Sequence, residues 1–503
     1  MNKNIFVALG VFVGILMILL VVVMLVGKGE QKPKTKPLVY PSEVFTLTWW
    51  NLYDDEDVYK EVIDQYKQAH PNANIKYVKK DEATYEEDLL NALAAGKGPD
   101  IFTLKNDEVF AHLDKLYPAP EQSNFYFIKP EKNAPKKDLK TQFQELFVEA
   151  ASQDLVYENQ VFGVPLYVDS LALYYNPNLF EEAQQEISAN YYQLISHTEN
   201  ETEQERLRTE LRRISNLLSA PPKTWDDFVE VVKLMTKKDA QGNIVRAAVA
   251  MGTAQNVNKA TDILSLLLMQ NNTQMVSEDK RSCSFHLPIK KQDGSSVYPG
   301  VAALDFYTSY ARPDKETYTW NSNFPDSVTA FAEGKVAMIF GYSYLTPYLK
   351  RKYGNFRFEI APMPQIKGIM DRLDFASYYP LVVAKNTPYP LAAWDFLKFL
   401  AKQKGHFSDV SKPLALREAA KEQYKQSQTA YLEDVNGQNV FNAQSYTARD
   451  WYKAGQAKKI SEIFNMMIDN VVAKKQTPQE AMNAAAVSCT NILNDAEPLI
   501  ERK

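Results

Sequence analysis

Between Val44 and Leu104 the chain switches repeatedly between the two hydrophobic periods of regular structure. Short apolar, β-prone runs occur at residues 44–51, 74–78 and 98–104. The segments between them repeat apolar residues at helical spacing, and Thr84 with Glu87 gives the second one the pattern of a capping box. Strand and helix therefore alternate, which predicts an α/β protein with a parallel sheet and right-handed crossovers. Ligands of such sheets bind beyond the carboxyl ends of the strands.

A longer apolar run extends from Val161 to Tyr175 and contains Asp169 as its only charge. Its valine, leucine and tyrosine residues favour a buried strand, and Pro177 ends the run because proline cannot donate to a strand ladder. Burial of a lone carboxylate is costly unless a partner satisfies it. Asp169 is therefore either satisfied structurally or faces a cleft where it holds a ligand. A second apolar run, again with tyrosines, spans residues 376–384.

The segment from Glu181 to Ser219 is highly charged, and its apolar residues recur near the helical period. A turn at residues 200–202 would fold it into an αα-hairpin. A solvated helical insertion accounts for the pattern, and an arm that docks a partner is the alternative. Residues 277–300 form a second, loop-like segment rich in Lys, Asp, Gly and Ser. Further helix starts with a capping pattern occur at Thr224 with Asp227 and at Thr477 with Glu480.

The first 27 residues differ in kind from the rest. Ile5 to Val26 is an uncharged run of 22 residues, which as a helix is about 33 Å long and sufficient to cross a bilayer core. No small-x-small cleavage site follows the run, so an uncleaved transmembrane anchor is favoured over a signal peptide. Residues 28–43 have three prolines among lysines and form an extended linker.

The charges that flank this anchor and the size of the body favour opposite orientations. Four lysines follow the apolar run, whereas only Lys3 and the terminal amine precede it, and this charge distribution would place the body in the cytoplasm. Large domains that follow an anchor nevertheless translocate largely regardless of charge. We expect the part of the chain after the anchor to face the outside, because the function inferred at the end of this section requires it.

Composition narrows the functional classes. A length of 503 residues predicts two or more domains. A net charge of −5 shows no excess of positive charge of the kind that nucleic-acid-binding proteins have. Aromatic residues reach 12%, which suits sugar-like ligands as well as cores. The histidines are scattered, and no motif for a metal, a phosphate or a nucleophilic serine occurs, so we expect neither a cofactor nor a metal. Cys283 and Cys489 either pair or stay free, since the sequence does not show the distance between them.

Four motifs, taken in order, are similar to one known family. They are Gly98-Pro-Asp-Ile-Phe102, the run Phe162–Asn176, Pro222-Lys-Thr-Trp-Asp-Asp-Phe228 and Ala330-Phe-Ala-Glu-Gly-Lys-Val-Ala-Met338. Residues 392–400 and 477–481 add further matches. Each motif is weak alone. Together, over Val44 to about Leu493, they make the chain resemble the family 1 extracellular solute-binding proteins of ATP-driven importers, the maltose-binding-protein superfamily.

This resemblance implies a two-lobed periplasmic-binding-protein fold of the type II kind, whose discontinuous lobes are linked by a hinge and close on the ligand. One lobe would contain residues 44–158 and 380–443. The other would contain residues 159–379 and 444–503, with the helical insertion at 181–219. The crossings between the lobes would be the run Val161–Tyr175, residues 376–384 and a segment near residues 444–455.

In sugar-binding members of the family, aromatic faces stack on the sugar rings while carboxylates and amides bind the hydroxyls. Carried over by position, the resemblance implies ligand-binding residues at strand ends and crossings: Trp50, Asn51, Tyr53, Asp107, Tyr167, Asp169, Trp320, Tyr342, Tyr344, Tyr378 and Trp451. The family's aromatic residue after the Pro-Asp-Ile motif falls on Leu104 here, a departure that weakens a sugar site in the first lobe.

The resemblance also implies a binding protein and not an enzyme. It would capture a sugar or oligosaccharide between closing lobes and deliver it to ABC permease subunits. Such a protein must face the outside, so residues 5–26 would make it a single-pass protein of the cell membrane with an extracytoplasmic body. A peptide, polyamine or other solute in the same fold is the main alternative. A glycoside-acting enzyme with two carboxylates, or a signalling or adhesion ectodomain, are further alternatives.

Overall fold

The computed structural model describes residues 39–121, 125–132, 135–354, 356–403, 412–429 and 437–496. The predicted anchor at residues 5–26 and the linker as far as residue 38 lie outside these ranges and stay predictions. Within the ranges, no helix combines the length and the apolar content needed to span a membrane. The chain from Tyr40 onward forms one unit.

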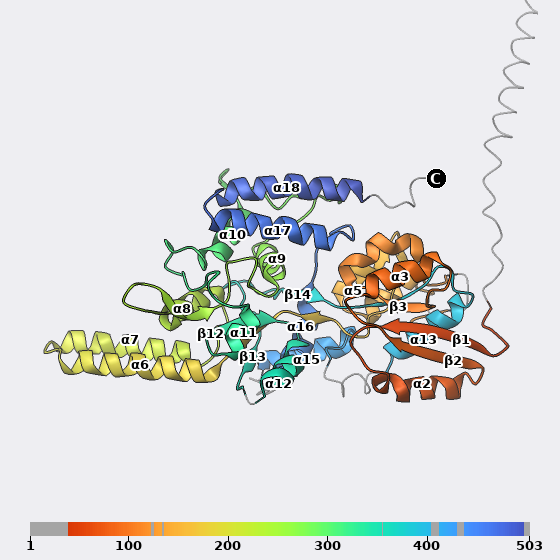
Figure 1. Cartoon of the computed structure of the whole chain (residues 1–503), viewed down its shortest axis with the longest axis horizontal. Coiled ribbons are helices and arrows are strands. Elements are labelled where there is room, and N and C mark those ends of the chain that lie inside the picture. Colours follow the sequence, from red (N-terminus) through yellow and green to blue (C-terminus); the bar gives the residue numbers. More distant parts are fainter. Residues whose placement is uncertain are drawn as a thin grey trace, which may run out of the picture. The chain divides into compact units, whose positions relative to one another are not determined.

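A four-stranded sheet in the order β15-β3-β1-β2 organises the first hydrophobic core (Figure 1). β1 (Phe45–Asn51) pairs in parallel with β2 (Ala73–Lys79) and β3 (Ile101–Thr103), which confirms the predicted alternation. β15 (Leu381–Val383) adds an antiparallel edge from far along the chain. The helices of this core are α2 (Asp57–Ala69), α3 (Tyr85–Ala94), α4 (Leu139–Leu146), α5 (Glu149–Leu155), α13 (Pro390–Ala401), α15 (Arg417–Thr429) and the 3-10 helix η1 (Asn106–Lys115).

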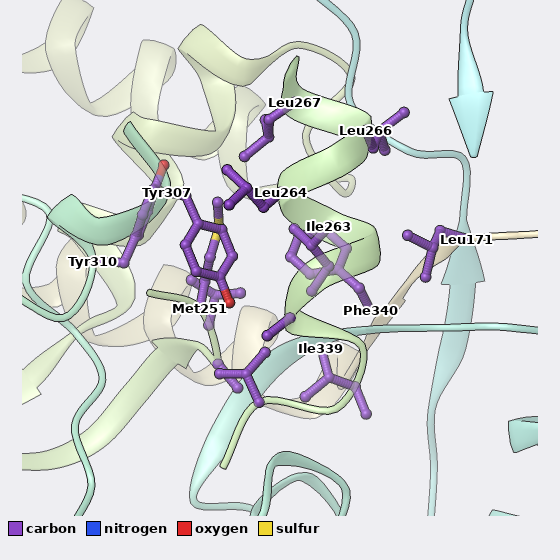
Figure 2. Close-up of a cluster of buried hydrophobic side chains, with 14 of the residues drawn as sticks. Leu171, Met251, Ile263, Leu264, Leu266, Leu267, Tyr307, Tyr310, Ile339 and Phe340 are labelled. Atoms are coloured by element: carbon purple, nitrogen blue, oxygen red, sulfur yellow. The ribbon is translucent and has the colours of Figure 1, made fainter. Parts of the chain in front are cut away.

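A five-stranded mixed sheet, in the order β13-β7-β12-β9-β8, organises the second core. Its strands are β7 (Ala172–Tyr175), β8 (Lys237–Lys238), β9 (Ile244–Val249), β12 (Val336–Gly341) and β13 (Glu359–Ala361). Helix α9 (Ala260–Gln270) is buried on most sides, and Figure 2 shows Leu264 on the side that faces Tyr307 and Leu266 on the other side. The other helices are α8 (Trp225–Met235), α10 (Pro299–Ser309), α11 (Ser327–Ala332), α12 (Leu345–Tyr353), α17 (Ala457–Val472) and α18 (Pro478–Asp495).

We call the elements around the first core the first lobe and those around the second core the second lobe. Three crossing segments meet between the lobes in a small sheet, β16-β14-β6, built from β6 (Asp169–Ser170), β14 (Asp374–Ser377) and β16 (Ala448–Arg449). The predicted single strand from Val161 to Tyr175 is wrong, because residues up to Val168 pack in the first core and residues from Leu171 pack in the second. The chain is instead divided into β5 (Gln160–Val161), which pairs with β4 (Val156–Tyr157), and the short strands β6 and β7.

The predicted limits of the lobes stay predictions, and the packing differs from them around the crossings. Buried residues between Val161 and Val168, together with Ala376, Tyr378 and Ala448, pack in the first core, although they were assigned to the second lobe. Phe441 of α16 (Gln438–Thr447) packs in the second core, although residues 380–443 were assigned to the first lobe.

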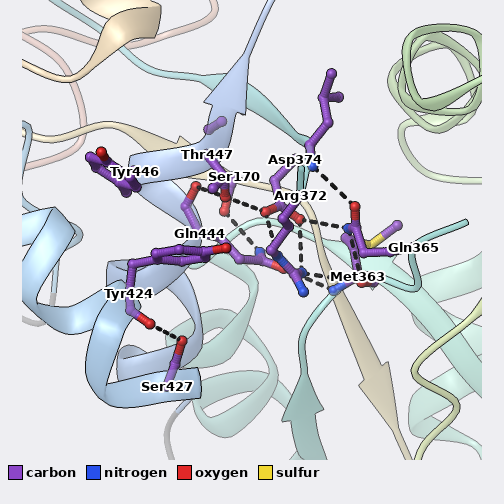
Figure 3. A network of polar contacts seen from close by, with 12 residues as sticks. Ser170, Met363, Gln365, Arg372, Asp374, Tyr424, Ser427, Gln444, Tyr446 and Thr447 are labelled. Atoms are coloured by element: carbon purple, nitrogen blue, oxygen red, sulfur yellow. Dashed lines mark hydrogen bonds and ion pairs between the residues drawn. The ribbon is translucent and has the colours of Figure 1, made fainter. Parts of the chain in front are cut away.

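A buried polar network holds the crossing strands together (Figure 3). Arg372 donates to both carboxylate oxygens of Asp374 at 2.7 and 2.9 Å, and to Gln444 at 2.7 Å. Gln444 in turn donates to the Ser170 hydroxyl at 3.0 Å, and Thr447 donates to Asp374 at 2.6 Å. The network therefore links all three crossings, and it satisfies a carboxylate that would be costly to bury alone.

Two helix starts show how capping chemistry depends on backbone geometry. The predicted box of Thr477 with Glu480 is complete in both directions before α18. The predicted box at Thr84 is wrong, since the side chain of Thr84 makes no capping bond. The backbone of Thr84 is near-helical (φ −111°, ψ −5°), and its hydroxyl lies against Asp88 instead.

The two extra segments are ordered in different ways. The predicted helical hairpin is confirmed as α6 (Pro177–Ser196) and α7 (Glu201–Leu218), which Figure 1 shows extending from the second lobe. The loop-like segment contains the short hairpin of β10 (Ile289–Lys290) and β11 (Ser296–Val297). The structure pairs Cys283 with Cys489 in a disulfide, which ties this segment to α18.

Candidate functional site

Tyr53, Tyr379 and Tyr85 line a cavity of about 150 Å³ in the first lobe. Tyr53 follows β1 in the left-handed conformation (φ 65°) and is 42% exposed. Its hydroxyl donates to Glu82 at 2.8 Å and lies 3.0 Å from the hydroxyl of Tyr379, whose ring centroid is 5.2 Å away. Glu108 lines the same cavity, and burial, followed by the charge of Asp107, raises the pKa of Glu108 to about 7. Aromatic faces and carboxylate acceptors thus lie together at the ends of β1 and β3.

Two further tyrosines form the corresponding wall of the second lobe. Tyr342 and Tyr344 follow β12, and their rings lie 6.3 Å apart with planes inclined by 23°. Tyr342 is buried and donates to Asp262 of α9 at 2.9 Å, whereas Tyr344 is 50% exposed. The ammonium group of Lys259, at the start of α9, lies 5.8 Å from both ring centroids.

Charged groups beside the two walls lie close enough to act on each other across the lobes. Burial alone would lower the pKa of Lys105, but Asp107 and Asp262 of the second lobe, together with Asp450, outweigh this effect and raise the pKa. The pKa of Lys259 is also raised against the effect of its burial, and Lys105 and Tyr379 of the first lobe are among the groups that act on it. We call the space between the two tyrosine walls the cleft.

A buried polar network lies beside the cleft and joins the first lobe to two crossings. Asn106 donates to Asp154 at 2.9 Å and to Asp450 at 3.1 Å, and the Tyr378 hydroxyl donates to Asp154 at 2.9 Å. Lys453 forms an ion pair with Asp450. Burial raises the pKa of both acids, and each carboxylate is held by donors from another segment. Tyr378 therefore belongs to this internal network, and its ring is buried.

Asp107 and Trp451 meet at a second cavity between the lobes, of about 340 Å³. Asp107 pairs with Lys105 at 2.8 Å, and its other carboxylate oxygen has no hydrogen-bond partner among the described residues. Burial alone would raise the pKa of Asp107, but Lys105 and Lys453 lower it. The Trp451 indole donates to Ser265 at 3.2 Å and presents little surface to the cavity.

Asp169, the single charge in the first crossing, is satisfied by the protein. Its carboxylate accepts bonds from the Ser170 amide at 2.8 Å, the Ser343 amide at 3.0 Å and the Ser343 hydroxyl at 2.7 Å. Burial raises the pKa of Asp169 to about 6, and the bonds from Ser343 oppose that rise. The carboxylate therefore fastens the first crossing to the loop that carries the tyrosines of the second lobe.

Trp320 and Asn51 are also buried. Trp320 is 0% exposed, donates to Asn256 at 3.0 Å and stacks on Phe324. It lies in the second core and not at the surface expected of a ligand-binding residue. Asn51 is also buried, and it donates to Tyr59 at 3.3 Å. Both side chains hold neighbouring residues of their own lobe through these hydrogen bonds.

Two other predicted aromatics lie under lysines. The ammonium group of Lys80 is 4.3 Å from the ring centroid of Trp50, and that of Lys412 is 4.3 Å from the ring centroid of Tyr167. Lys412 also pairs with Asp54, at the end of the first strand. These cation–π contacts occupy one face of each ring.

Several residues of the cleft were missed by sequence reasoning: Glu82, Lys105, Lys259, Asp262 and Tyr379. Two signals could have found some of them. Lys105 lies two residues after β3, at the ligand end of a parallel strand. Tyr379 follows a buried tyrosine, and alternation along an extended chain directs it to the other side. Within the described residues, no group of three or more His, Cys, Asp or Glu side chains is arranged to hold a metal.

Comparison with known proteins agrees with this architecture. The model of the bacterial extracellular solute-binding protein family matches residues 50–406. A galactooligosaccharide-binding protein of Bacillus subtilis (strain 168) is 24% identical over 136 residues. That match spans 27% of this chain and 28% of the relative.

Solved structures share the fold over almost their whole length. The cyclic α-maltosyl-1,6-maltose binding protein of Arthrobacter globiformis has a TM-score of 0.65 at 15% identity, over 90% of this chain and 100% of that one. The sugar-binding protein MalE of Xanthomonas citri has a TM-score of 0.63 at 17% identity, over 91% and 100%. A solute-binding protein of Thermotoga lettingae, bound with α-D-tagatose, has a TM-score of 0.55 at 19% identity, over 89% and 99%. At these identities the likeness establishes the fold, a two-lobed α/β solute-binding fold.

Proposed function

Because this chain belongs to the bacterial extracellular solute-binding protein family, we propose that it captures a sugar or oligosaccharide between its lobes and delivers it to the permease of an ATP-driven importer. The observation that carries the proposal is the pair of tyrosine walls, Tyr53 with Tyr379 and Tyr342 with Tyr344. Aromatic faces on both sides of a cleft suit the apolar faces of a sugar ring. The relatives, named for galactooligosaccharide and cyclic maltosyl-maltose or bound with tagatose, support this ligand class.

The charges of the cleft favour a neutral polyol over an ion. Charges of both signs lie there, with Glu82, Asp107 and Asp262 near Lys105 and Lys259. The carboxylates already accept bonds from tyrosine hydroxyls or lysine, and a sugar hydroxyl would offer them the same kind of donor. A polyanion or polycation would leave the like-charged members of this mixed set unpaired.

We also propose that the three crossing strands form the hinge and that closure brings both walls onto the solute. Tyr53 and Tyr344 are the more exposed members of their walls, so they have the most surface left to bury. Ser343, which lies next to Tyr344, is bonded to Asp169 of the first crossing. A movement of this crossing would therefore be transmitted directly to the second wall.

The location follows from the family and from the disulfide. We propose that residues 5–26 anchor the protein in the cell membrane and that the body is extracytoplasmic. The bond between Cys283 and Cys489 supports this placement, because structural disulfides persist in oxidising compartments. A chain that delivers a solute to an importer has to meet that solute on the outer side.

The experiment is a thermal-shift screen of the full-length protein in detergent. The sugars are maltotetraose, a galactooligosaccharide and tagatose, and the comparison solutes are spermidine and a tripeptide. A ligand that binds only the native state raises the melting temperature, so at least one sugar should raise it. The variant Tyr344→Ala should show a smaller shift while keeping the melting temperature of the unliganded protein. A shift with spermidine or peptide alone would reject the carbohydrate, and steady release of glycoside hydrolysis products would reject a purely binding role.

A further inference from the structure

A separate cavity of about 410 Å³ lies at the opposite end of the crossing strands from the cleft. Leu373 and Thr447, which come just before β14 and β16, line it. Tyr379 and Trp451, which line the cavities described above, come just after the same two strands. Because β14 and β16 are parallel, this cavity lies at their amino ends and the cleft lies at their carboxyl ends. We call it the rear cavity.

Three arginines line the rear cavity, and two of them are already neutralised. Arg372 pairs with the buried carboxylate of Asp374 at 2.7 Å. Arg449 donates to Glu149 at 2.6 Å and also donates to two backbone carbonyls at 2.8 and 3.2 Å. Two of the three positive charges are therefore matched by acids of the protein.

Arg417 is the arginine without an acid. It donates through Nε to the Phe147 carbonyl at 3.1 Å, and within the described part of the chain its two terminal nitrogens have no partner. Asp371 is exposed at the rim and forms no ion pair with Arg417 among the described residues. Burial lowers the pKa of Arg449, although Glu149 opposes this effect. The positive charge of Arg417 lowers the pKa of Arg449 further. The cavity thus has an uncompensated positive charge beside a guanidinium that is already destabilised.

Two tyrosines supply further donors. The rings of Tyr424 on α15 and Tyr446 on α16 lie 5.5 Å apart, and Figure 3 shows them beside each other at the edge of the network around Arg372. Both side chains are half-buried and line the rear cavity. Neither hydroxyl has a hydrogen-bond partner among the described residues, so both are available to a bound group.

We propose that the rear cavity binds an oxyanion, the charged group of a phosphate, sulfate or carboxylate, through Arg417 and the hydroxyls of Tyr424 and Tyr446. A guanidinium with two free terminal nitrogens matches two oxygens of such a group, and a charge-assisted bond is about twice as strong as a neutral one. The site shares no lining residue with the other two cavities, so it is distinct from the solute cleft and does not depend on the proposed carbohydrate.

The test is isothermal titration of the full-length protein with inorganic phosphate, at an ionic strength kept constant with sodium chloride. Arg417→Gln should weaken phosphate binding by about tenfold or more, since it removes the charge that contacts the ion. Lys425→Gln removes the same charge from an exposed position on the same helix and should leave the affinity unchanged. Arg417→Lys, which keeps the charge without the planar fork, should give an intermediate affinity.

Glu149→Gln is a second variant whose expected result is a gain of affinity, which a misfolded protein would not show. It removes the acid that competes with an anion for Arg449, so phosphate should bind several-fold more tightly. Unchanged affinity in Arg417→Gln, no gain in Glu149→Gln, or equal heats from chloride and phosphate would each overturn the proposal. Parallel titrations with sulfate, acetate and glucose 6-phosphate identify the class of anion that the site binds. The anion with the highest affinity shows whether the site takes a free ion or an organic ester. A separate titration with maltotetraose keeps the outcome for the cleft independent.

Discussion

Asp169→Asn separates a carboxylate that fastens the hinge from one that binds the solute. The substitution keeps the size of the side chain but replaces one acceptor oxygen by an NH2 group. In the native protein the carboxylate accepts three bonds, from the Ser170 amide and from the amide and hydroxyl of Ser343. An NH2 group facing donors of Ser343 loses an acceptor, and leaving such a donor unsatisfied costs about 1–3 kcal/mol.

The size of the pH effect follows from the pKa. Burial raises the pKa of Asp169 from an ordinary value of 3.8 to about 6, and a shift of about 2 units corresponds to about 3 kcal/mol. Between these two values the native protein holds a proton that the unfolded chain has released. The free energy of unfolding of the wild type therefore falls as the pH rises from about 4 to about 6, and Asp169→Asn lacks this fall. Relative to the wild type, the variant should gain up to about 3 kcal/mol across that window.

Urea unfolding of both proteins, followed by far-UV circular dichroism at several pH values, measures this difference. Asp138→Asn is a control of opposite sign. Bonds from Thr141 lower the pKa of Asp138, so the stability that Asp138 contributes is present at higher pH and is lost as the pH falls through its folded pKa. A stability difference between Asp169→Asn and the wild type that does not change with pH would refute the buried, structurally bonded carboxylate. Loss of saccharide binding with unchanged stability would assign Asp169 to the ligand instead.

Three further substitutions test other contacts. Cys283→Ser removes the disulfide to Cys489 and should lower the unfolding free energy by about 2–5 kcal/mol, and a reducing agent should produce a comparable loss in the wild type only. Trp320→Phe should lower the melting temperature without changing saccharide affinity by calorimetry; a weakened affinity at unchanged stability would return this side chain to the ligand site. Arg372→Met leaves the carboxylate of Asp374 buried without its cation and should cost about 3–5 kcal/mol in urea unfolding, whereas a neutral result would mean that the network around it compensates.

Features that depend on neighbouring residues were predictable from the sequence. Alternating periods predicted the parallel sheet of β1, β2 and β3, because each strand and helix buries a face that its own residues define. The helical hairpin α6–α7 followed from the same periodicity. The box at Thr477 formed, whereas the one at Thr84 did not, since the capping pattern requires a non-helical backbone at the cap that the motif alone does not specify.

Features that join distant segments were not predictable. Tyr53 and Tyr379 are 326 residues apart and share a hydrogen bond. Asp169 finds its partner, Ser343, 174 residues further along the chain, so the sequence left its role open. Among the predicted aromatics, Trp320 and Tyr344 have similar surroundings in the sequence but opposite exposure, because tertiary packing decides which ring is covered.

The central claim is that one solute contacts both tyrosine walls. It is tested most directly by isothermal titration of the most strongly stabilising sugar from the screen into the wild type and into Tyr53→Ala and Tyr344→Ala. If the solute bridges the lobes, each substitution should weaken binding by about tenfold, which corresponds to about 1.4 kcal/mol, while the unliganded variants keep their melting temperatures. Affinity that depends on one wall alone, or on neither, would contradict capture between the two lobes.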